Sequence, residues 1–145
     1  MNNTKTKTAA LLELTAPYDN PYQGKATRLL FVCSVGLLRS PTAAAFFAQR
    51  GYNTRSCGSM VGCALIPVSA NLVEWAHQIC FMTYENKQET LALFHEDKVT
   101  QEVIRGKSVV LNITDDYEYM QPELVTELNS VAHKILPQVW ASDVR

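Results

Sequence analysis

The chain has 145 residues, of which 47% are hydrophobic and 19% charged, so one globular domain with a single core is expected. The formal net charge of −1 excludes the basic excess that is typical of a general nucleic-acid binder. We therefore expect no nucleic-acid partner. No apolar run reaches the ~20 residues of a membrane span, so we expect no membrane partner either.

Four cysteines are present, at Cys33, Cys57, Cys63 and Cys80. No pair has the Cys-x-x-Cys spacing of a zinc or redox site, so no metal and no other cofactor is expected. A secreted disulfide scaffold would also fit an even count, but the early run 9–14 is short and is interrupted by Glu13, unlike a signal peptide. We therefore expect free thiols and a cytoplasmic location.

Residues 1–27 differ in composition from the rest of the chain. They are rich in Asn, Thr and Lys, and then contain two prolines and a glycine. We interpret them as a flexible arm with a short helical turn near 9–14. Residues 28–145 form the predicted domain.

From residue 28 onward, short apolar runs alternate with helical patterns. Strands are predicted over residues 29–33, 52–57, 79–83 and 108–113. Helices are predicted over residues 40–50, 69–77, 86–94 and 122–135, with a short helical turn near 101–105. Ser40 suits the N-cap of the first helix, Pro41 its first position and Gly51 its C-terminal cap.

Strands that are separated by helices favour a parallel sheet with helices on both faces, an α/β fold. Ligands of such sheets bind at the carboxyl ends of the strands. Two loops at that end carry reactive residues, at 34–40 and 114–121. We name residues 33–40 the anion loop and residues 114–121 the acid loop.

The anion loop follows a predicted strand and leads into a predicted helix. Five residues between Cys33 and Arg39 are enough to curl the backbone so that successive N–H groups point inward around an anion. Gly36 permits a positive φ within the curl. The predicted phosphate-binding residues are Ser34, Val35, Gly36, Leu37, Leu38 and Arg39, with the guanidinium adding two donors to the backbone amides.

Cys33 would sit at the centre of this positive field, which favours a nucleophilic thiolate. Ser40 could donate a hydrogen bond to that thiolate. Taken singly, a cysteine at a strand end is usually core and an arginine at a helix start is usually solvated. The combination of strand, Cys33, five residues, Arg39-Ser40-Pro41 and helix is much less ordinary.

The sequence Leu-Phe-Val-Cys-x5-Arg-Ser-Pro-Thr-Ala at residues 30–43 resembles the opening of low-molecular-weight protein tyrosine phosphatases, above all their short bacterial and phage branch. The resemblance extends through segments 55–59, 74–76 and 113–117, and covers residues 28–128. It implies a three-layer sandwich whose four parallel strands lie in the order 2-1-3-4. It also implies that Ser56 supports the anion loop.

Attack by a thiolate on a phosphomonoester expels an alkoxide or phenolate, which needs a proton. The family supplies this proton from Asp-Pro-Tyr, and the chain has Asp115-Asp116-Tyr117 in its place. The resemblance therefore assigns the acid role to Asp115, while Asp116 replaces the proline. A solvated acidic turn is the alternative reading. Tyr117 and Tyr119 would line the mouth of the site.

Two supports of the family's loop have no counterpart here. Val35-Gly36 stands where the family has Gly-Asn, so no amide side chain can brace the loop, and the bracing histidine has no clear match. We interpret His77, His95 and His133 as surface or core residues.

The leading hypothesis is a cysteine-dependent hydrolase that forms a phosphocysteine intermediate on a phosphotyrosine protein or a small phosphomonoester. The first alternative is a catalytically weak module that binds a phosphorylated ligand. The second is a thiol-dependent arsenate reductase, although the late paired thiols of such enzymes are missing. The sequence leaves the oligomeric state open.

Overall fold

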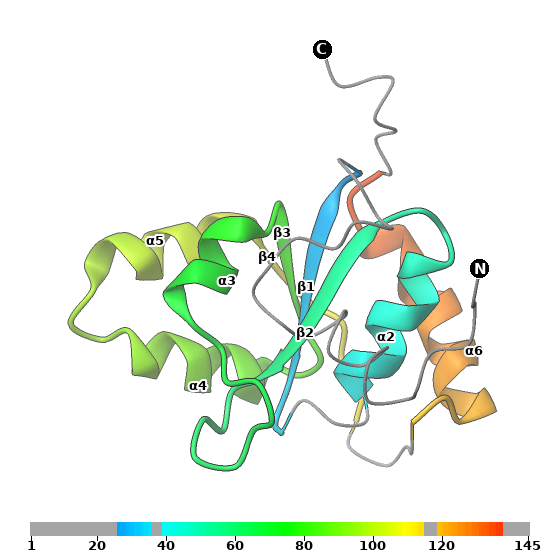
Figure 1. Cartoon of the computed structure of the whole chain (residues 1–145), viewed down its shortest axis with the longest axis horizontal. Helices are drawn as coiled ribbons and strands as arrows, with labels where there is room; N and C mark the ends of the chain where they lie inside the picture. The colour runs from blue at the N-terminus through cyan, green and yellow to red at the C-terminus, as the bar shows by residue number, and fades with distance from the viewer. Residues whose placement is uncertain (1–25, 36–38, 115–118, 138–145) are drawn as a thin grey trace, which may run out of the picture.

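Four parallel strands form the central sheet in the computed structural model, which describes residues 26–35, 39–114 and 119–137 (Figure 1). The strands are β1 (Arg28–Cys33), β2 (Asn53–Gly58), β3 (Gln78–Phe81) and β4 (Ser108–Val110). They lie in the order β2-β1-β3-β4, so the predicted order is confirmed. In the register, Val32 of β1 lies beside Cys57 and Phe81.

Helices cover both faces of the sheet. They are α2 (Arg39–Ala48), α3 (Ala70–Trp75), α4 (Tyr84–Leu93), α5 (Lys98–Lys107) and α6 (Pro122–Val131), with a short 3-10 helix η1 (Ala132–Lys134). α2 and α6 pack on one face through side chains such as Phe47 and Leu124. α3, α4 and α5 pack on the other through Leu72, Leu91 and Ile104. The three-layer sandwich is confirmed, and β1 is a continuous apolar run because both of its faces are covered.

The structure contradicts the predicted N-cap of α2 and confirms its predicted C-terminal cap. Ser40 lies inside the helix and not at its N-cap, and Pro41 follows it there, so that prediction was wrong. The Ser40 hydroxyl contacts Cys33 and the Cys57 carbonyl instead of a helix N–H group. The C-terminal prediction is confirmed, because Gly51 has a φ of 92° and donates to the Ala48 carbonyl at 3.0 Å.

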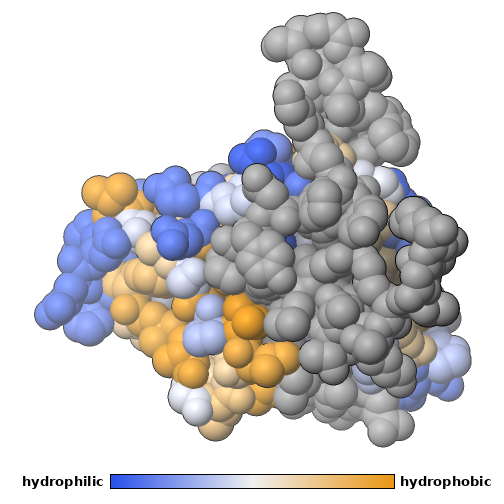
Figure 2. All heavy atoms as spheres, in the orientation of Figure 1, coloured by the Kyte–Doolittle hydropathy of each residue, from blue (hydrophilic) through white to orange (hydrophobic). Residues whose placement is uncertain are grey.

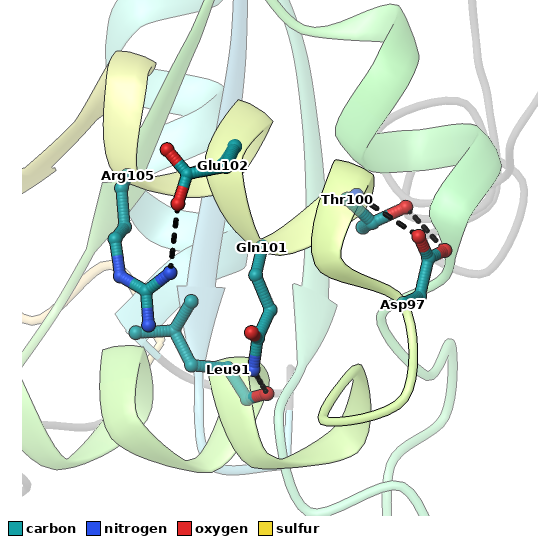
Figure 3. A network of polar contacts seen from close by, with 6 residues as sticks. All are labelled: Leu91, Asp97, Thr100, Gln101, Glu102 and Arg105. Atoms are coloured by element: carbon teal, nitrogen blue, oxygen red, sulfur yellow. Dashed lines mark hydrogen bonds and ion pairs between the residues drawn. The ribbon is translucent and has the colours of Figure 1, made fainter.

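α4 and α5 begin at side-chain caps that the hydrophobic pattern did not reveal. Thr83 caps α4, so β3 ends at Phe81, earlier than predicted. Asp97 caps α5, which makes that element a ten-residue helix where only a helical turn was predicted. Gln101 of α5 donates through Nε2 to the Leu91 carbonyl of α4 at 2.9 Å, which ties the two helices together (Figure 3).

The connection between β2 and α3, residues 59–69, carries exposed apolar side chains. Met60, Val61 and Leu65 are 44%, 40% and 50% exposed. Figure 2 shows apolar surface in the region where Figure 1 places this connection. Among the helices of the described ranges, none has the length and hydropathy of a membrane-crossing segment.

Little of the predicted N-terminal arm can be compared with the structure. Residues 1–25, including the predicted turn at 9–14, lie outside the described residues. Ala26 and Thr27 are buried. The Thr27 carbonyl accepts from the Asn53 N–H at 2.9 Å, so these two residues pack with the start of the sheet.

Candidate active site

Cys33 is the last residue of β1 and lies at the carboxyl end of the sheet. It is 2% exposed, and its Sγ is 3.1 Å from the Oγ of Ser40 in the first turn of α2. The same Oγ is 3.3 Å from the carbonyl oxygen of Cys57 in β2. The structure thus brings together two of the residues that the sequence selected, a thiol and a hydroxyl at the start of a helix.

The backbone of the anion loop is held by the β2–α3 connection. The carbonyls of Cys33, Ser34 and Val35 accept hydrogen bonds from the N–H groups of residues 59, 60 and 65, at 2.9, 2.8 and 3.3 Å. A planar trans peptide points its N–H opposite to its carbonyl. The N–H groups of Ser34 and Val35 therefore point away from the connection, as the donors of a curled anion site must. Residues 36–38, Gly36, Leu37 and Leu38, lie outside the described residues.

Gly58 makes this close contact possible. A Cβ at this position would lie 2.8 Å from the carbonyl oxygen of Ser34, 2.8 Å from the carbonyl carbon of Val35 and 2.6 Å from the Cβ of Ala64. Two of these atoms belong to the backbone of the anion loop, which cannot move aside as a flexible side chain could. Glycine is therefore required at the end of β2 for the loop to take its position.

Arg39 is the first residue of α2 and is 2% exposed. Its NH1 donates to the carbonyl of Ile113 at 2.8 Å. Ile113 lies two residues before Asp115, so the arginine of the anion loop contacts the start of the segment that leads into the acid loop. This contact joins the two loops that the sequence selected.

The other end of the acid loop is also attached to the first turn of α2. The N–H of Met120 donates to the Oγ1 of Thr42 at 2.8 Å. Met120 has a φ of 57°, a left-handed conformation that turns the chain into α6. The structure therefore describes the two ends of the acid loop. Asp115, Asp116 and Tyr117 lie outside the described residues, and the roles of these three residues stay predictions. Tyr119 is partly exposed.

Ser56 is buried in the middle of β2, and its hydroxyl has no hydrogen-bond partner among the residues that the structure describes. Its predicted support of the anion loop stays a prediction. The three histidines lie on the surface. His95 and His133 contact carbonyls of their own helical segments, and His77 accepts from the Arg28 N–H at the opposite end of the sheet.

Sequence reasoning missed a polar cluster beside the anion loop, formed by Ser34, Ser59, Asn86 and Glu89. The Nδ2 of Asn86 in α4 lies 3.3 Å from the Oγ of Ser34 and 3.2 Å from the Oγ of Ser59. The only signal in the sequence was the spacing Thr83-x-x-Asn86, which is that of a helix N-terminal capping pair. It did not reveal the contact with Ser34.

The remaining cysteines differ from Cys33 in their surroundings. Burial raises the pKa of the Cys57 and Cys80 thiols, and Cys33 raises that of Cys57 further. The Cys57 side chain packs with the core on the opposite face of the sheet from Cys33, and Cys63 is exposed. No group of three metal-ligating side chains occurs in residues 26–35, 39–114 and 119–137.

Neither models of protein families nor curated protein sequences gave a match to the chain. Solved structures did. The YwlE arginine phosphatase from Geobacillus stearothermophilus is 20% identical, with a TM-score of 0.50 over 74% of this chain and 92% of that one. Wzb from Vibrio vulnificus in complex with benzylphosphonate is 15% identical, with a TM-score of 0.51 over 74% and 92%.

The tyrosine phosphatase Wzb from Escherichia coli K30 in complex with phosphate is 12% identical, with a TM-score of 0.50 over 74% of this chain and 94% of that one. The chain has the low-molecular-weight phosphatase fold. Within this fold, the passage from β1 to α2 carries Cys33, Arg39 and Ser40. At such sequence identities the likeness establishes the fold.

Proposed function

We propose that the chain is a member of the low-molecular-weight protein tyrosine phosphatase family and hydrolyses phosphomonoesters through Cys33. One observation carries the proposal. The Cys33 sulfur lies 3.1 Å from the Ser40 hydroxyl at the start of α2, beside a backbone whose carbonyls face the β2–α3 connection. A phosphate held by the opposing N–H groups would meet both the sulfur and the positive end of the helix dipole.

In the first step the Cys33 thiolate attacks phosphorus, forming the S–P bond as the P–O bond to the leaving group breaks. Asp115 donates the proton that the leaving oxygen needs. Arg39 and the loop amides hold the three remaining phosphate oxygens. In the second step water attacks phosphorus, Asp115 takes its proton and the sulfur leaves as a thiolate that accepts from Ser40.

The residues on either side of Asp115 support its proposed role. Ile113, just before the acid loop, and Met120, near its end, are hydrogen-bonded to Arg39 and Thr42 in the first turn of α2. A segment that is attached at both ends to the helix beside Cys33 can bring a carboxyl group to a leaving oxygen there. The similar structures named above include a tyrosine phosphatase with phosphate and a Wzb protein with benzylphosphonate, an aryl-bearing ligand. These likenesses favour an aryl phosphate as substrate.

The test is hydrolysis of p-nitrophenyl phosphate by the wild type and by Cys33→Ser, Asp115→Asn and Asp116→Asn. We expect no detectable turnover by Cys33→Ser, because a serine hydroxyl is a far weaker nucleophile than a thiolate. Asp115→Asn should lower kcat by about 100-fold, the usual contribution of a general acid. Asp116→Asn is the matched control and should keep most of the activity.

Equal turnover by the wild type and Cys33→Ser would refute the mechanism. A larger loss with Asp116→Asn than with Asp115→Asn would move the acid role to Asp116. Orthovanadate binding without turnover would identify a module that binds phosphorylated ligands. Because one similar structure is an arginine phosphatase, phosphotyrosine and phosphoarginine peptides should be compared side by side, and we expect the tyrosine peptide to be the better substrate.

A further inference from the structure

The Asn86 side chain lies at the meeting point of the anion loop, the β2–α3 connection and α4. It is 1% exposed and belongs to the first turn of α4. A buried amide that is hydrogen-bonded in full is rigid, because leaving any of its polar atoms without a partner is costly. Its orientation is therefore a fixed feature of the site.

The contacts of Asn86 determine which of its amide atoms faces the loop. Its Oδ1 accepts from the N–H of Thr83 at 3.2 Å and from the Thr83 hydroxyl at 3.0 Å. A backbone N–H can only donate, so the oxygen must face Thr83. The Nδ2 then faces the Oγ atoms of Ser34 and Ser59 at 3.3 and 3.2 Å, with a longer contact of 3.4 Å to Glu89.

Ser59 extends the same network to Cys33, the residue before Ser34. Its hydroxyl donates to the Glu89 carboxylate at 2.6 Å, and its backbone N–H donates to the carbonyl of Cys33 at 2.9 Å. Glu89 lies one turn after Asn86 on α4. The cluster thus connects two consecutive residues of the anion loop, Cys33 and Ser34, to one helix.

We propose that Asn86 is a positioning residue that fixes the first residues of the anion loop from α4. This inference rests on the proposed function, because it supposes that the N–H groups of Ser34 and Val35 bind the phosphoryl oxygens. Small displacements of such donors weaken oxyanion binding steeply. The anion loop has no amide side chain of its own at Gly36. Asn86 supplies such a brace from α4.

The test compares Asn86→Ala with Asp97→Ala. Asp97→Ala removes the N-cap of the neighbouring helix α5, at an exposed site away from the loop, so it is a matched loss of helix capping (Figure 3). We expect Asn86→Ala to raise the inhibition constant of orthovanadate by about 5- to 10-fold, as for one lost hydrogen bond. Asp97→Ala should leave this constant unchanged while it lowers the melting temperature. Equal constants for the two variants would overturn the proposal.

Ser34→Ala is a second variant that keeps the backbone donor and leaves no large cavity. If Asn86 acts through Ser34, orthovanadate should inhibit the Ser34→Ala/Asn86→Ala double variant no more weakly than it inhibits Asn86→Ala alone. Fully additive effects would contradict the proposal.

Amide hydrogen exchange separates this inference from the proposed function. Peptides that contain residues 33–35 should exchange faster in Asn86→Ala than in Asp97→Ala, whether or not the protein turns over any substrate. A wild type that neither hydrolyses p-nitrophenyl phosphate nor binds orthovanadate would refute the function. In that case the exchange comparison alone would decide whether Asn86 holds the loop, and equal exchange would overturn that role.

Discussion

The Ser40 hydroxyl has one proton and two acceptors within reach, the Cys33 sulfur at 3.1 Å and the Cys57 carbonyl at 3.3 Å. When Cys33 is a thiol, its S–H can donate to Ser40, which then donates to Cys57. When Cys33 is a thiolate, the hydroxyl turns to the sulfur. In the proposed mechanism, Ser40 would therefore stabilise the charged sulfur both before attack and after departure.

We predict that a side chain at Gly58 displaces the anion loop. Gly58→Ala would force a Cβ to within 2.8 Å of two backbone atoms of the anion loop. We expect the loop to shift, with a loss of stability of about 1–3 kcal/mol and weaker orthovanadate inhibition. Gly62→Ala is the matched control on the same connection, because a Cβ there meets no atom within 4 Å. Unaltered inhibition in Gly58→Ala would show that the loop tolerates the clash.

The sequence selected neighbouring residues where chemistry and local spacing agree, and their catalytic roles stay predictions. Cys33, Arg39 and Ser40 lie within eight consecutive residues, so one motif revealed them together. Asn86 was missed because its contact with Ser34 joins residues 52 positions apart. An asparagine beside a helix start is ordinary in sequence, and only the folded chain shows what its amide reaches.

At the scale of elements, the first turn of α2 organises both loops. It carries Arg39 and Ser40 of the anion loop, and it binds Ile113, just before the acid loop, through Arg39 and Met120 of the acid loop through Thr42. A segment whose flanking residues are hydrogen-bonded to a helix has less conformational freedom to lose than one held only by its chain neighbours. Under the proposed function, the first turn of α2 would position the acid loop as well as contribute to oxyanion binding.

Thr42→Val tests this arrangement. Valine keeps the shape of threonine but cannot accept the hydrogen bond from the Met120 N–H. We expect kcat for p-nitrophenyl phosphate to fall by about 5- to 10-fold, the effect of one hydrogen bond, while orthovanadate inhibition stays unchanged. Thr126→Val on the exposed part of α6 is the control. A parallel loss of orthovanadate affinity would indicate that the anion loop itself had been disturbed.

Element types were predicted more reliably than their ends. Strand and helix order follow from apolar runs and their spacing, and the parallel sheet follows from their alternation. The ends depend on caps such as Thr83 and Asp97, whose hydrogen bonds decide where a helix starts. The hydrophobic pattern carries no record of these bonds, which is why α5 was predicted as a turn.

At the scale of the whole molecule, the two ends of the sheet carry different kinds of residue contact. The carboxyl end holds the reactive groups, and the opposite end joins β1 to β3. There the Nδ1 of His77 accepts from the Arg28 N–H at 2.9 Å, and the His77 N–H donates to the Arg28 carbonyl at 2.9 Å. Although His77 lies at the surface, partial burial of its ring lowers its pKa below the ordinary value of 6.5, and Arg28 and Lys107 lower it further.

This lowered pKa predicts a pH-dependent stability. The folded state binds a proton at His77 less readily than the unfolded chain, so the stabilisation is complete above the ordinary pKa of 6.5. It is lost as pH falls below that value towards the folded pKa. His77→Asn can still accept from Arg28 but does not titrate. Between about pH 7 and about pH 5 the wild type should lose more melting temperature than His77→Asn, and equal losses would contradict the assignment.

The β2–α3 connection holds the anion loop with backbone N–H groups, while its Met60 and Leu65 side chains face solvent, 44% and 50% exposed. Main-chain donors do not depend on which side chain they carry. The hydrogen bonds that hold the anion loop and the side chains on the surface beside it are therefore chemically separable within one short stretch of chain. Under the proposed function, these side chains could be exchanged to alter contacts with a substrate while the backbone of the anion loop stays in place.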